Sequence, residues 1–480
     1  MLDLTTFLSP EEFGALIPGP LARYRQAVLE GVAFFLGQLP LERLAAIQAA
    51  QAALPPDSRL ERRIIETARF SPVLHKLGQV LARDRRLPLE LRRPLQQLET
   101  MPPSVGLEVV EGWVEAEIGP LGRHGLRFDG PPLAEASVAI VAPFASMSAA
   151  EPFRGVFKVL KPGIEARLEQ DLRALEATGS WLDQRCDALG LPPIAYQATF
   201  GDVSRLLARE VALEQEQTNL DLARRVFADA AEIVIPEPHP ASSARLTAMG
   251  RVDGRKVTAI DVQTSTGRGR LARLIADALA ARPLWSPHTK GVFHADPHAG
   301  NLMVTPDGRL AILDWALTGV LWKHERIPLT QILVGALTLD GRRIVAAIEA
   351  LSRAPLARGP LERRVHESLQ RLTRQGFPGV GWLTELLDGV ALEAGGQFSP
   401  DLVLFRKSVH TLKGVLADVD GEVALDGAIA LRLMNQLAAE AGPRWLAHPL
   451  SRQFGSHLSN ADLLELMLNG PLAPYRYWWR

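Results

Sequence analysis

The sequence predicts an α+β fold that is mainly helical, and three observations lead to this prediction. Residues 1–104 carry apolar side chains at helical spacing, as in 41–54. Residues 105–260 mix amphipathic helical segments with a Val- and Phe-rich strand at 155–163. Within 302–313, two short apolar segments flank Thr-Pro-Asp-Gly, which predicts a β-hairpin.

The remaining elements follow from the same periodicities. Ser71-Pro72 predicts a helix start, and Pro102-Pro103 ends the N-terminal helical region. Two long amphipathic helices are expected at 164–190 and 204–228, and a strand with a Gly-containing connector at 245–257. The chain from 261 onward reads as mainly helical around the hairpin.

Composition limits the class of protein. The 480 residues are 47% hydrophobic, enough for two or three packed units. A formal net charge of −1 provides no overall field that would attract nucleic acid, so we expect no nucleic-acid partner. A single cysteine, Cys186, cannot form an internal disulfide and fits a reducing compartment. The acidic N-terminus does not resemble a signal peptide, and no apolar run approaches the roughly 20 residues that span a bilayer, so a cytoplasmic protein is expected.

The predicted hairpin places polar side chains at its open end. Asn301 stands at its entry and Asp314 at its exit, so the two should lie side by side. Asp296 stands five residues before Asn301, which is the Asp-x-x-x-x-Asn spacing of protein kinases, and Asp314 takes the place of the aspartate in Asp-Phe-Gly. An acidic group for the acceptor and an amide plus a carboxylate for Mg²⁺ are what phosphoryl transfer requires. A hairpin with incidental polar residues is the plainer alternative.

The histidines of the same stretch allow another interpretation. His294, Asp296 and His298 form a His-x-Asp-x-His run that could bind a metal ion directly. No further cluster of His or Cys in the sequence completes such a site.

A phosphoryl-transfer site also needs a strand lysine and a helix glutamate. Lys158, on the predicted strand in Val-Phe-Lys-Val, is the candidate lysine, and Lys161 three residues later is expected to be solvated. The glutamate should come from 209–219. Spacing alone leaves Glu210, Glu214 and Glu216 open.

No Gly-x-Gly-x-x-Gly loop precedes Lys158. The corresponding place holds Ala134-Glu135-Ala136-Ser137, whose small residues still permit close approach of backbone N–H groups to phosphate.

Taken together, these stretches resemble the UbiB/ADCK (aarF-domain, ABC1-type) atypical protein-kinase-like family over about residues 70–420. His-Ala-Asp-Pro-His-Ala-Gly-Asn and Leu-Asp-Trp-Ala are similar to its HADPHPGN and LLDFG signature. Lys76 and Gln79 match its K-x-G-Q motif, and Ala134, Ala136 and Ser137 match its alanine-rich loop. Glu210 matches the E of E-x-D.

The resemblance implies roles for these residues. Glu216, with Asn219, matches R-E-A-x-N and is the implied partner of Lys158. Asp296 becomes the catalytic residue, and Asn301 and Asp314 become the metal ligands. Lys76, Gln79 and Glu210 belong to a regulatory extension that folds over the active site. ATP and Mg²⁺ are the implied cofactors.

The resemblance also implies a fold and a function. It predicts a bilobal protein-kinase-like fold with a helical extension over 1–104, an N-lobe over 105–255 and a helical C-lobe over 256–480. The implied activity is that of an atypical kinase or ATPase supporting isoprenoid-quinone (ubiquinone-like) or related lipid metabolism. Prenyl-quinone or lipid intermediates and a membrane surface are the implied partners.

The sequence departs from the family pattern at several positions, including Ala299, which replaces a proline, and Trp315, which replaces a phenylalanine. Ala212 replaces the Asp of E-x-D, and Ala316 replaces the Gly of D-F-G. These two substitutions motivate a second hypothesis, a nucleotide-binding scaffold or lipid chaperone without phosphoryl transfer. A kinase of protein substrates is a third hypothesis.

Overall fold

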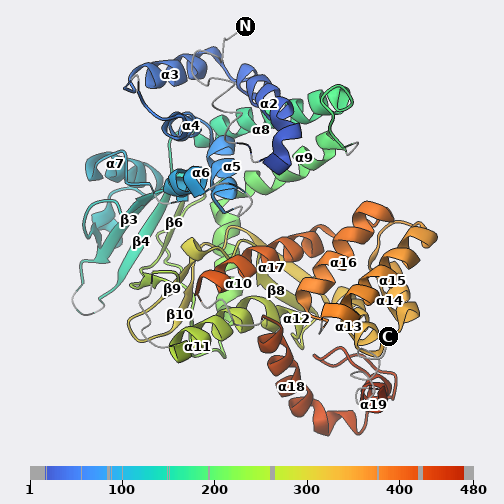
Figure 1. Cartoon of the computed structure of the whole chain (residues 1–480). Helices are drawn as coiled ribbons and strands as arrows, with labels where there is room; N and C mark the ends of the chain where they lie inside the picture. Colours follow the sequence, from blue (N-terminus) through green and yellow to red (C-terminus); the bar gives the residue numbers. More distant parts are fainter. Residues whose placement is uncertain are drawn as a thin grey trace. The chain divides into compact units, whose positions relative to one another are not determined.

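The computed structural model of the chain describes residues 17–469, apart from 18, 56, 84–86, 88, 100, 149, 151, 193–194, 260–264, 376–377 and 420–424. It divides the chain into two compact units. The first contains residues 1–221 and 236–252, and the second contains 222–235 and 253–480. Helices dominate both units and small sheets lie in each, so the predicted α+β class is confirmed (Figure 1).

The first unit combines an antiparallel sheet with helices that lie before and between its strands in the sequence. Its strands are β1 (Leu126–Phe128), β2 (Ala134–Glu135), β3 (Ala139–Ser146), β4 (Arg154–Leu160) and β6 (Leu246–Gly250), in the order β1-β3-β4-β6 with β2 beside β3. Its helices are α2 (Arg25–Gly37), α3 (Leu41–Ala52), α4 (Leu60–Ala68), α5 (Pro72–Arg83), α6 (Leu89–Leu95), α7 (Leu107–Ile118), α8 (Ile164–Arg185), α9 (Tyr196–Leu207) and the start of α10 (Leu213–Val226).

The sheet of the first unit is held by aromatic packing on one face. Phe144 of β3 and Phe157 of β4 are fully buried and stack with ring centroids 4.1 Å apart. Val110 and Val114, one helical turn apart on α7, join this core. Gly155 is required here, because a Cβ at this position would lie 2.3 Å from the Phe144 ring. The register then places Lys158 between Val141 of β3 and Thr247 of β6.

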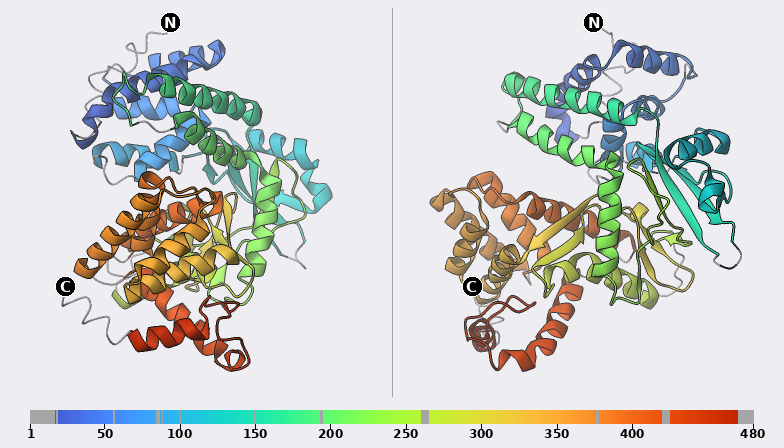
Figure 2. Two further views of the ribbon diagram at one scale, coloured as in Figure 1. Left: turned by 90° about the vertical axis from the view of Figure 1, so that its right-hand side faces the viewer. Right: turned by 180° about the vertical axis from the view of Figure 1, so that it is seen from behind.

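The N-terminal helices are fastened to α8 by a buried carboxylate. Asp171 of α8 accepts a hydrogen bond from Ser71 Oγ at 2.5 Å and pairs with Arg43 of α3. Burial raises the pKa of Asp171, although the Ser71 and Arg43 contacts oppose the shift. Helices α8 and α9 lie side by side in both views of Figure 2.

One predicted helix is wrong. The segment 204–228 is not continuous, because α9 ends at Leu207, a 3₁₀ turn follows over Ala208–Val211, and α10 starts at Leu213. Ala212 lies between them with φ −88° and ψ 68°, outside the helical region. Periodicity could not reveal the break, since the apolar pattern continues across it.

The second unit is a helical assembly around two small sheets. One sheet has the order β5-β10-β9-β7 and the other pairs β11 with β8. The strands are β5 (Ile233–Val234), β7 (Arg255–Lys256), β8 (Lys290–His294), β9 (Leu302–Val304), β10 (Leu310–Ile312) and β11 (Thr318–Trp322). The helices are α11 (Ser265–Ala276), α12 (Arg282–Leu284), α13 (Lys323–Thr338), α14 (Gly341–Leu351), α15 (Arg358–Gln375), α16 (Val380–Glu393), α17 (Pro400–Val419), α18 (Leu425–Arg444) and α19 (Asn460–Asn469).

Candidate phosphoryl-transfer site

The predicted hairpin is confirmed and brings two polar residues to one end. Strands β9 and β10 pair antiparallel, with Leu302 opposite Ile312. The backbone N–H of Leu313 donates to the carbonyl oxygen of Asn301 at 2.8 Å, which closes the open end of the hairpin. Asn301 and Asp314, separated by the whole hairpin in sequence, therefore stand at the same end of it.

The loop before the hairpin is folded onto Asn301. The Asn301 side chain is buried, and its Nδ2 donates to the carbonyl oxygen of Asp296 at 3.2 Å. The backbone N–H groups of His298 and Asn301 donate to the carbonyls of Asp296 and His298 at 2.8 and 2.9 Å. Because the amide nitrogen of Asn301 is turned to the loop, its amide oxygen is the atom left to act as an oxygen ligand, which fits the preference of Mg²⁺.

His294 connects this loop to Asp314. The ring is buried with an exposed fraction of 1%, its Nδ1 accepts from the backbone N–H of Asp296 at 3.2 Å, and its Nε2 faces the carbonyl oxygens of Leu313 and Asp314 at 3.0 and 2.8 Å. This pattern assigns the tautomer with the proton on Nε2. Both ring nitrogens are thus used within the protein.

The direct metal site considered for the His-x-Asp-x-His run gains no support from these contacts. The Nδ1 atom of His298 accepts from the backbone N–H of Gly300 at 3.0 Å, and its Nε2 lies 3.9 Å from Asp296 Oδ2. Within the described part of the chain, no group of three or more His, Cys, Asp or Glu side chains is arranged to hold a metal ion.

Asp314 is held in an unusual backbone conformation. Its φ of 53° lies in the left-handed region, which Asp and Asn tolerate better than most residues. The side chain is exposed, and its Oδ1 accepts from the backbone N–H of Ala316 at 3.3 Å. The neighbouring Trp315 points the other way: it is buried, donates from Nε1 to Ile312 O at 3.1 Å, and packs edge-on to the His294 ring at 4.9 Å.

In the first unit, the strand lysine has a carboxylate partner. Lys158 Nζ lies 2.8 and 2.9 Å from the two carboxylate oxygens of Glu216 in the first turn of α10. Both side chains are largely buried, with exposed fractions of 12% and 3%. Glu214 is exposed, so of the three glutamates that spacing left open, the structure pairs Glu216 with Lys158.

The third glutamate, Glu210, joins residues of the extension and the alanine-rich loop. Lys76 Nζ lies 2.7 Å from its Oε1, and Ser137 Oγ donates to its Oε2 at 3.3 Å. Gln79 instead donates to the carbonyl oxygen of Leu98 at 2.8 Å, where the His75 ring also bonds. The fold thus brings Lys76, Glu210 and Ser137 together, while Gln79 anchors α5 to the 3₁₀ turn Gln96–Glu99, which follows α6.

The expectation that Lys161 is solvated is wrong. Its Nζ lies 2.6 Å from the carboxylate of Glu135, whose side chain is only 8% exposed, and donates to the carbonyl oxygen of Ala136 at 2.8 Å. Burial by itself would raise the pKa of Glu135, but hydrogen bonds from Lys161 and Ser104 outweigh it and lower the pKa. The pair fixes the loop in which Ala134, Ala136 and Ser137 lie. Nothing in the sequence singled out Glu135 except its place between small residues.

These features define a class of protein. A strand lysine paired with a helix glutamate, followed along the chain by an Asp-x-x-x-x-Asn loop, a hairpin and an aspartate, is the arrangement of a protein-kinase-like fold. The model of the ABC1 atypical kinase-like domain matches residues 100–348, more than half of the chain, and the chain belongs to this family.

The chain is also similar to individual proteins. An uncharacterized protein of Synechocystis sp. is 26% identical over 379 residues, which are 76% of this chain and 63% of that protein, so the chain spans less than two thirds of this relative. A protein of Xanthomonas axonopodis pv. citri named probable protein kinase UbiB is 26% identical over 478 residues, covering 92% of this chain and 81% of its own. A solved Mycobacterium tuberculosis structure, the Rv3197–erythromycin complex, aligns with a TM-score of 0.49 at 17% identity over 72% of this chain and 91% of its own.

No helix among the residues described combines the length and the apolar character needed to cross a membrane.

Proposed function

We propose that this chain is an atypical kinase or ATPase that binds ATP with Mg²⁺ and transfers or releases the terminal phosphoryl group. The observation that carries the proposal is the buried Lys158–Glu216 pair at 2.8 Å. Burying a lysine in the middle of a sheet costs desolvation free energy, even when one glutamate pairs with it. Phosphoryl-transfer sites use such a pair to hold nucleotide phosphates.

The second unit supplies the complementary chemistry in this proposal. The amide oxygen of Asn301 and the carboxylate of Asp314 are hard oxygen donors that suit Mg²⁺, and they stand at the same end of one hairpin. When bound, the ion would neutralise phosphate charge. Asp296 would orient the acceptor hydroxyl or a water molecule.

The remaining assignments are also proposals. The backbone of the loop containing Ala134, Ala136 and Ser137 would contact nucleotide phosphate. Lys76, Gln79 and Glu210 would form a regulatory extension. The division into an extension at 1–104, an N-lobe at 105–255 and a C-lobe at 256–480 stays a prediction.

The cellular role rests on the names of relatives. Because proteins named UbiB match most of the chain, we propose that it supports isoprenoid-quinone, ubiquinone-like or related lipid metabolism. Its partners would then be prenyl-quinone or other lipid intermediates. Its location would be cytoplasmic, with peripheral contact to a membrane surface.

The test compares wild type with Asp314→Asn in Mg²⁺-dependent ATP hydrolysis and in thermal-shift binding of Mg·ATP. Asparagine also tolerates the left-handed backbone at this position, so the variant removes charge with little strain. Asp307→Asn at the turn of the same hairpin is the matched control. Wild type and Asp307→Asn should hydrolyse ATP, and Asp314→Asn should not. Absence of Mg·ATP binding by wild type would overturn the proposal.

A nucleotide-binding scaffold without turnover is the second candidate. The observation that favours it is Ala212, which stands outside both neighbouring helices where the family motif has a carboxylate. Binding of Mg·ATP by wild type without phosphate release, even with lipid or phenol added, would select this candidate.

A further inference from the structure

A pocket of about 90 Å³ lies in the helical part of the second unit, apart from every residue assigned above. Its lining is almost entirely hydrocarbon. Helix α13 contributes Leu333, Val334 and Leu337, α18 contributes Ile429 and Leu433, and α19 contributes Leu466. Apolar surface of this kind gains free energy when an apolar group covers it and removes it from water.

Polar groups at the edge of the pocket are engaged within the protein. Thr330 Oγ1 donates to Arg326 O at 2.9 Å, and Trp285 Nε1 donates to Ile429 O at 3.0 Å. Asp426 Oδ1 accepts from the backbone N–H of Val380 at 2.7 Å. Because these groups already have partners, the pocket selects for hydrocarbon rather than for a hydrogen-bonding head group.

The pocket continues into apolar side chains on the surface. Ala430 lines it and is itself exposed, and Met434, four residues later on the same face of α18, is 63% exposed. On α19, Met467 follows the lining residue Leu466 and is 72% exposed. Exposed methionines on the two helices that line the pocket offer an adaptable apolar surface.

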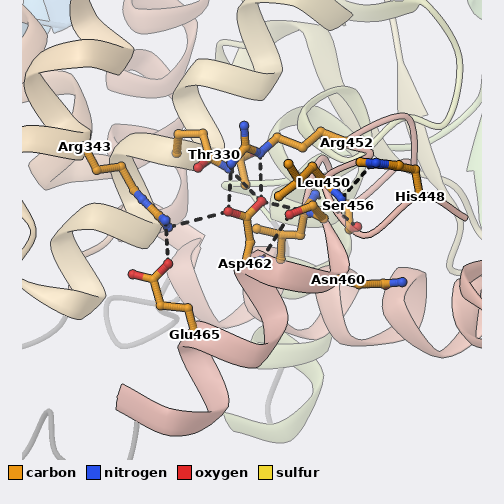
Figure 3. Close-up of polar contacts among 12 residues, drawn as sticks. Thr330, Arg343, His448, Leu450, Arg452, Ser456, Asn460, Asp462 and Glu465 are labelled. Atoms are coloured by element: carbon orange, nitrogen blue, oxygen red, sulfur yellow. Dashed lines mark hydrogen bonds and ion pairs between the residues drawn. The ribbon is translucent and has the colours of Figure 1, made fainter.

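A charge cluster holds one wall in place (Figure 3). Arg452 donates from Nε and Nη2 to the two oxygens of Asp462 at 2.8 and 2.9 Å, and the backbone N–H of Ser459 donates to the same carboxylate at 2.9 Å. Gln331 of α13 reaches Asp462 at 3.2 Å. These bonds tie the segment carrying Leu458 and the start of α19 to α13, so the pocket exists without a ligand.

We propose that this pocket binds the end of the hydrocarbon chain of a single amphiphilic molecule, whose remaining carbons lie along the exposed face of α18. Its volume is smaller than the roughly 150 Å³ of an apolar cavity that accepts benzene, so only the terminal carbons enter. The site is independent of the nucleotide chemistry proposed above. An isoprenoid and a linear fatty chain share the required chemistry.

The experiment titrates the full-length chain, in detergent-free buffer, with geraniol in one arm and n-decanol in the other, by isothermal calorimetry and thermal shift. Ala430→Trp fills the opening from an exposed position, and Ala439→Trp, exposed on the opposite side of α18, is the matched control. Wild type and Ala439→Trp should bind at least one alcohol saturably, with Kd at least tenfold higher for Ala430→Trp. The arm with the lower Kd identifies the chain type.

Two results would overturn the proposal: no saturable binding of either alcohol to wild type, or equal affinity in wild type and Ala430→Trp. If Ala430→Trp fails to fold, Leu433→Gln at the same opening replaces it, with the same expected loss. Asp314→Asn should bind the alcohols as wild type does. Alcohol binding without ATP binding would therefore overturn only the proposed function. ATP binding without alcohol binding would overturn only this inference.

Discussion

His294 Nε2 lies 2.8 Å from the carbonyl oxygen of Asp314, while Nδ1 of the same ring accepts the backbone N–H of Asp296 at 3.2 Å. One buried imidazole thus fixes the backbone at both carboxylates proposed for phosphoryl transfer. Its position at the end of β8, which pairs with β11, makes the arrangement rigid. His294 is a positioning residue in this interpretation.

His294→Phe should preserve the packing on Trp315 while removing the hydrogen bonds at Asp296 and Asp314. Leaving buried backbone groups unpaired costs about 1–3 kcal/mol of unfolding free energy. We expect ATP turnover to fall more than ATP affinity, because geometry at the reacting groups is lost. Steady-state kinetics and ATP binding would measure the two effects. His324→Phe, at an exposed position, is the control; unchanged turnover in His294→Phe would rule out the positioning role.

Glu216→Gln should weaken ATP binding roughly tenfold or more, equivalent to about 1.4 kcal/mol, because Lys158 loses its charged partner. Glu214→Gln, two residues away and exposed, should bind ATP as wild type does. Calorimetric titration with Mg·ATP distinguishes them. Equal losses in the two variants would show that the pair has no special role.

Lys161→Met should destabilise the protein by about 3–5 kcal/mol, because it leaves the Glu135 carboxylate buried without its ion partner. Urea unfolding measures the change. Adding Glu135→Gln to this variant should restore part of the loss, since the uncompensated charge is removed. If the double variant were no more stable than Lys161→Met, the destabilisation would not arise from the buried charge.

The Glu135–Lys161 pair also predicts that the free energy of unfolding depends on pH. The pKa of Glu135 is lowered from 4.5, so the pair stabilises the fold above that value, and the stabilisation is lost as pH falls through the lowered pKa. Glu135→Gln should make unfolding free energy less sensitive to acid in this range.

Burial of His457 predicts that the free energy of unfolding also depends on pH in a second, higher range. The ring is fully buried, and burial together with the nearby Arg326 charge lowers the pKa of His457 from 6.5 to about 3. Between these values the unfolded chain binds a proton that the folded chain does not, so unfolding free energy falls as pH decreases from 6.5.

His457→Asn should flatten this part of the profile, and asparagine suits the φ of 58° at this position. Denaturant unfolding at several pH values between 4 and 7 (about one step per half unit) would measure it. His448→Asn, at an exposed position, is the control. A slope in His457→Asn as steep as in wild type would contradict the assignment.

Features that depend on neighbouring residues could be predicted from the amino-acid sequence. The hairpin followed from two apolar segments around Pro-Asp-Gly, and the helices at 41–54 and 164–190 followed from apolar periodicity. The spacing of Asp296, Asn301 and Asp314 also identified the class of protein. These inferences succeeded because turn residues and side-chain periodicity act within a few residues of themselves.

The partners of the charged side chains become visible only in the three-dimensional structure. Spacing and periodicity could not predict the helix break at Ala212, the pairing of Glu216 with Lys158, or the pairing of Lys161 with Glu135. They also could not predict that Arg43 pairs with Asp171, which stands 128 positions later. A lysine on a strand is solvated or buried according to what packs above it, and that depends on segments remote in sequence. Partner choice is therefore a property of packing, where burial sets how strongly each charge needs its counterpart.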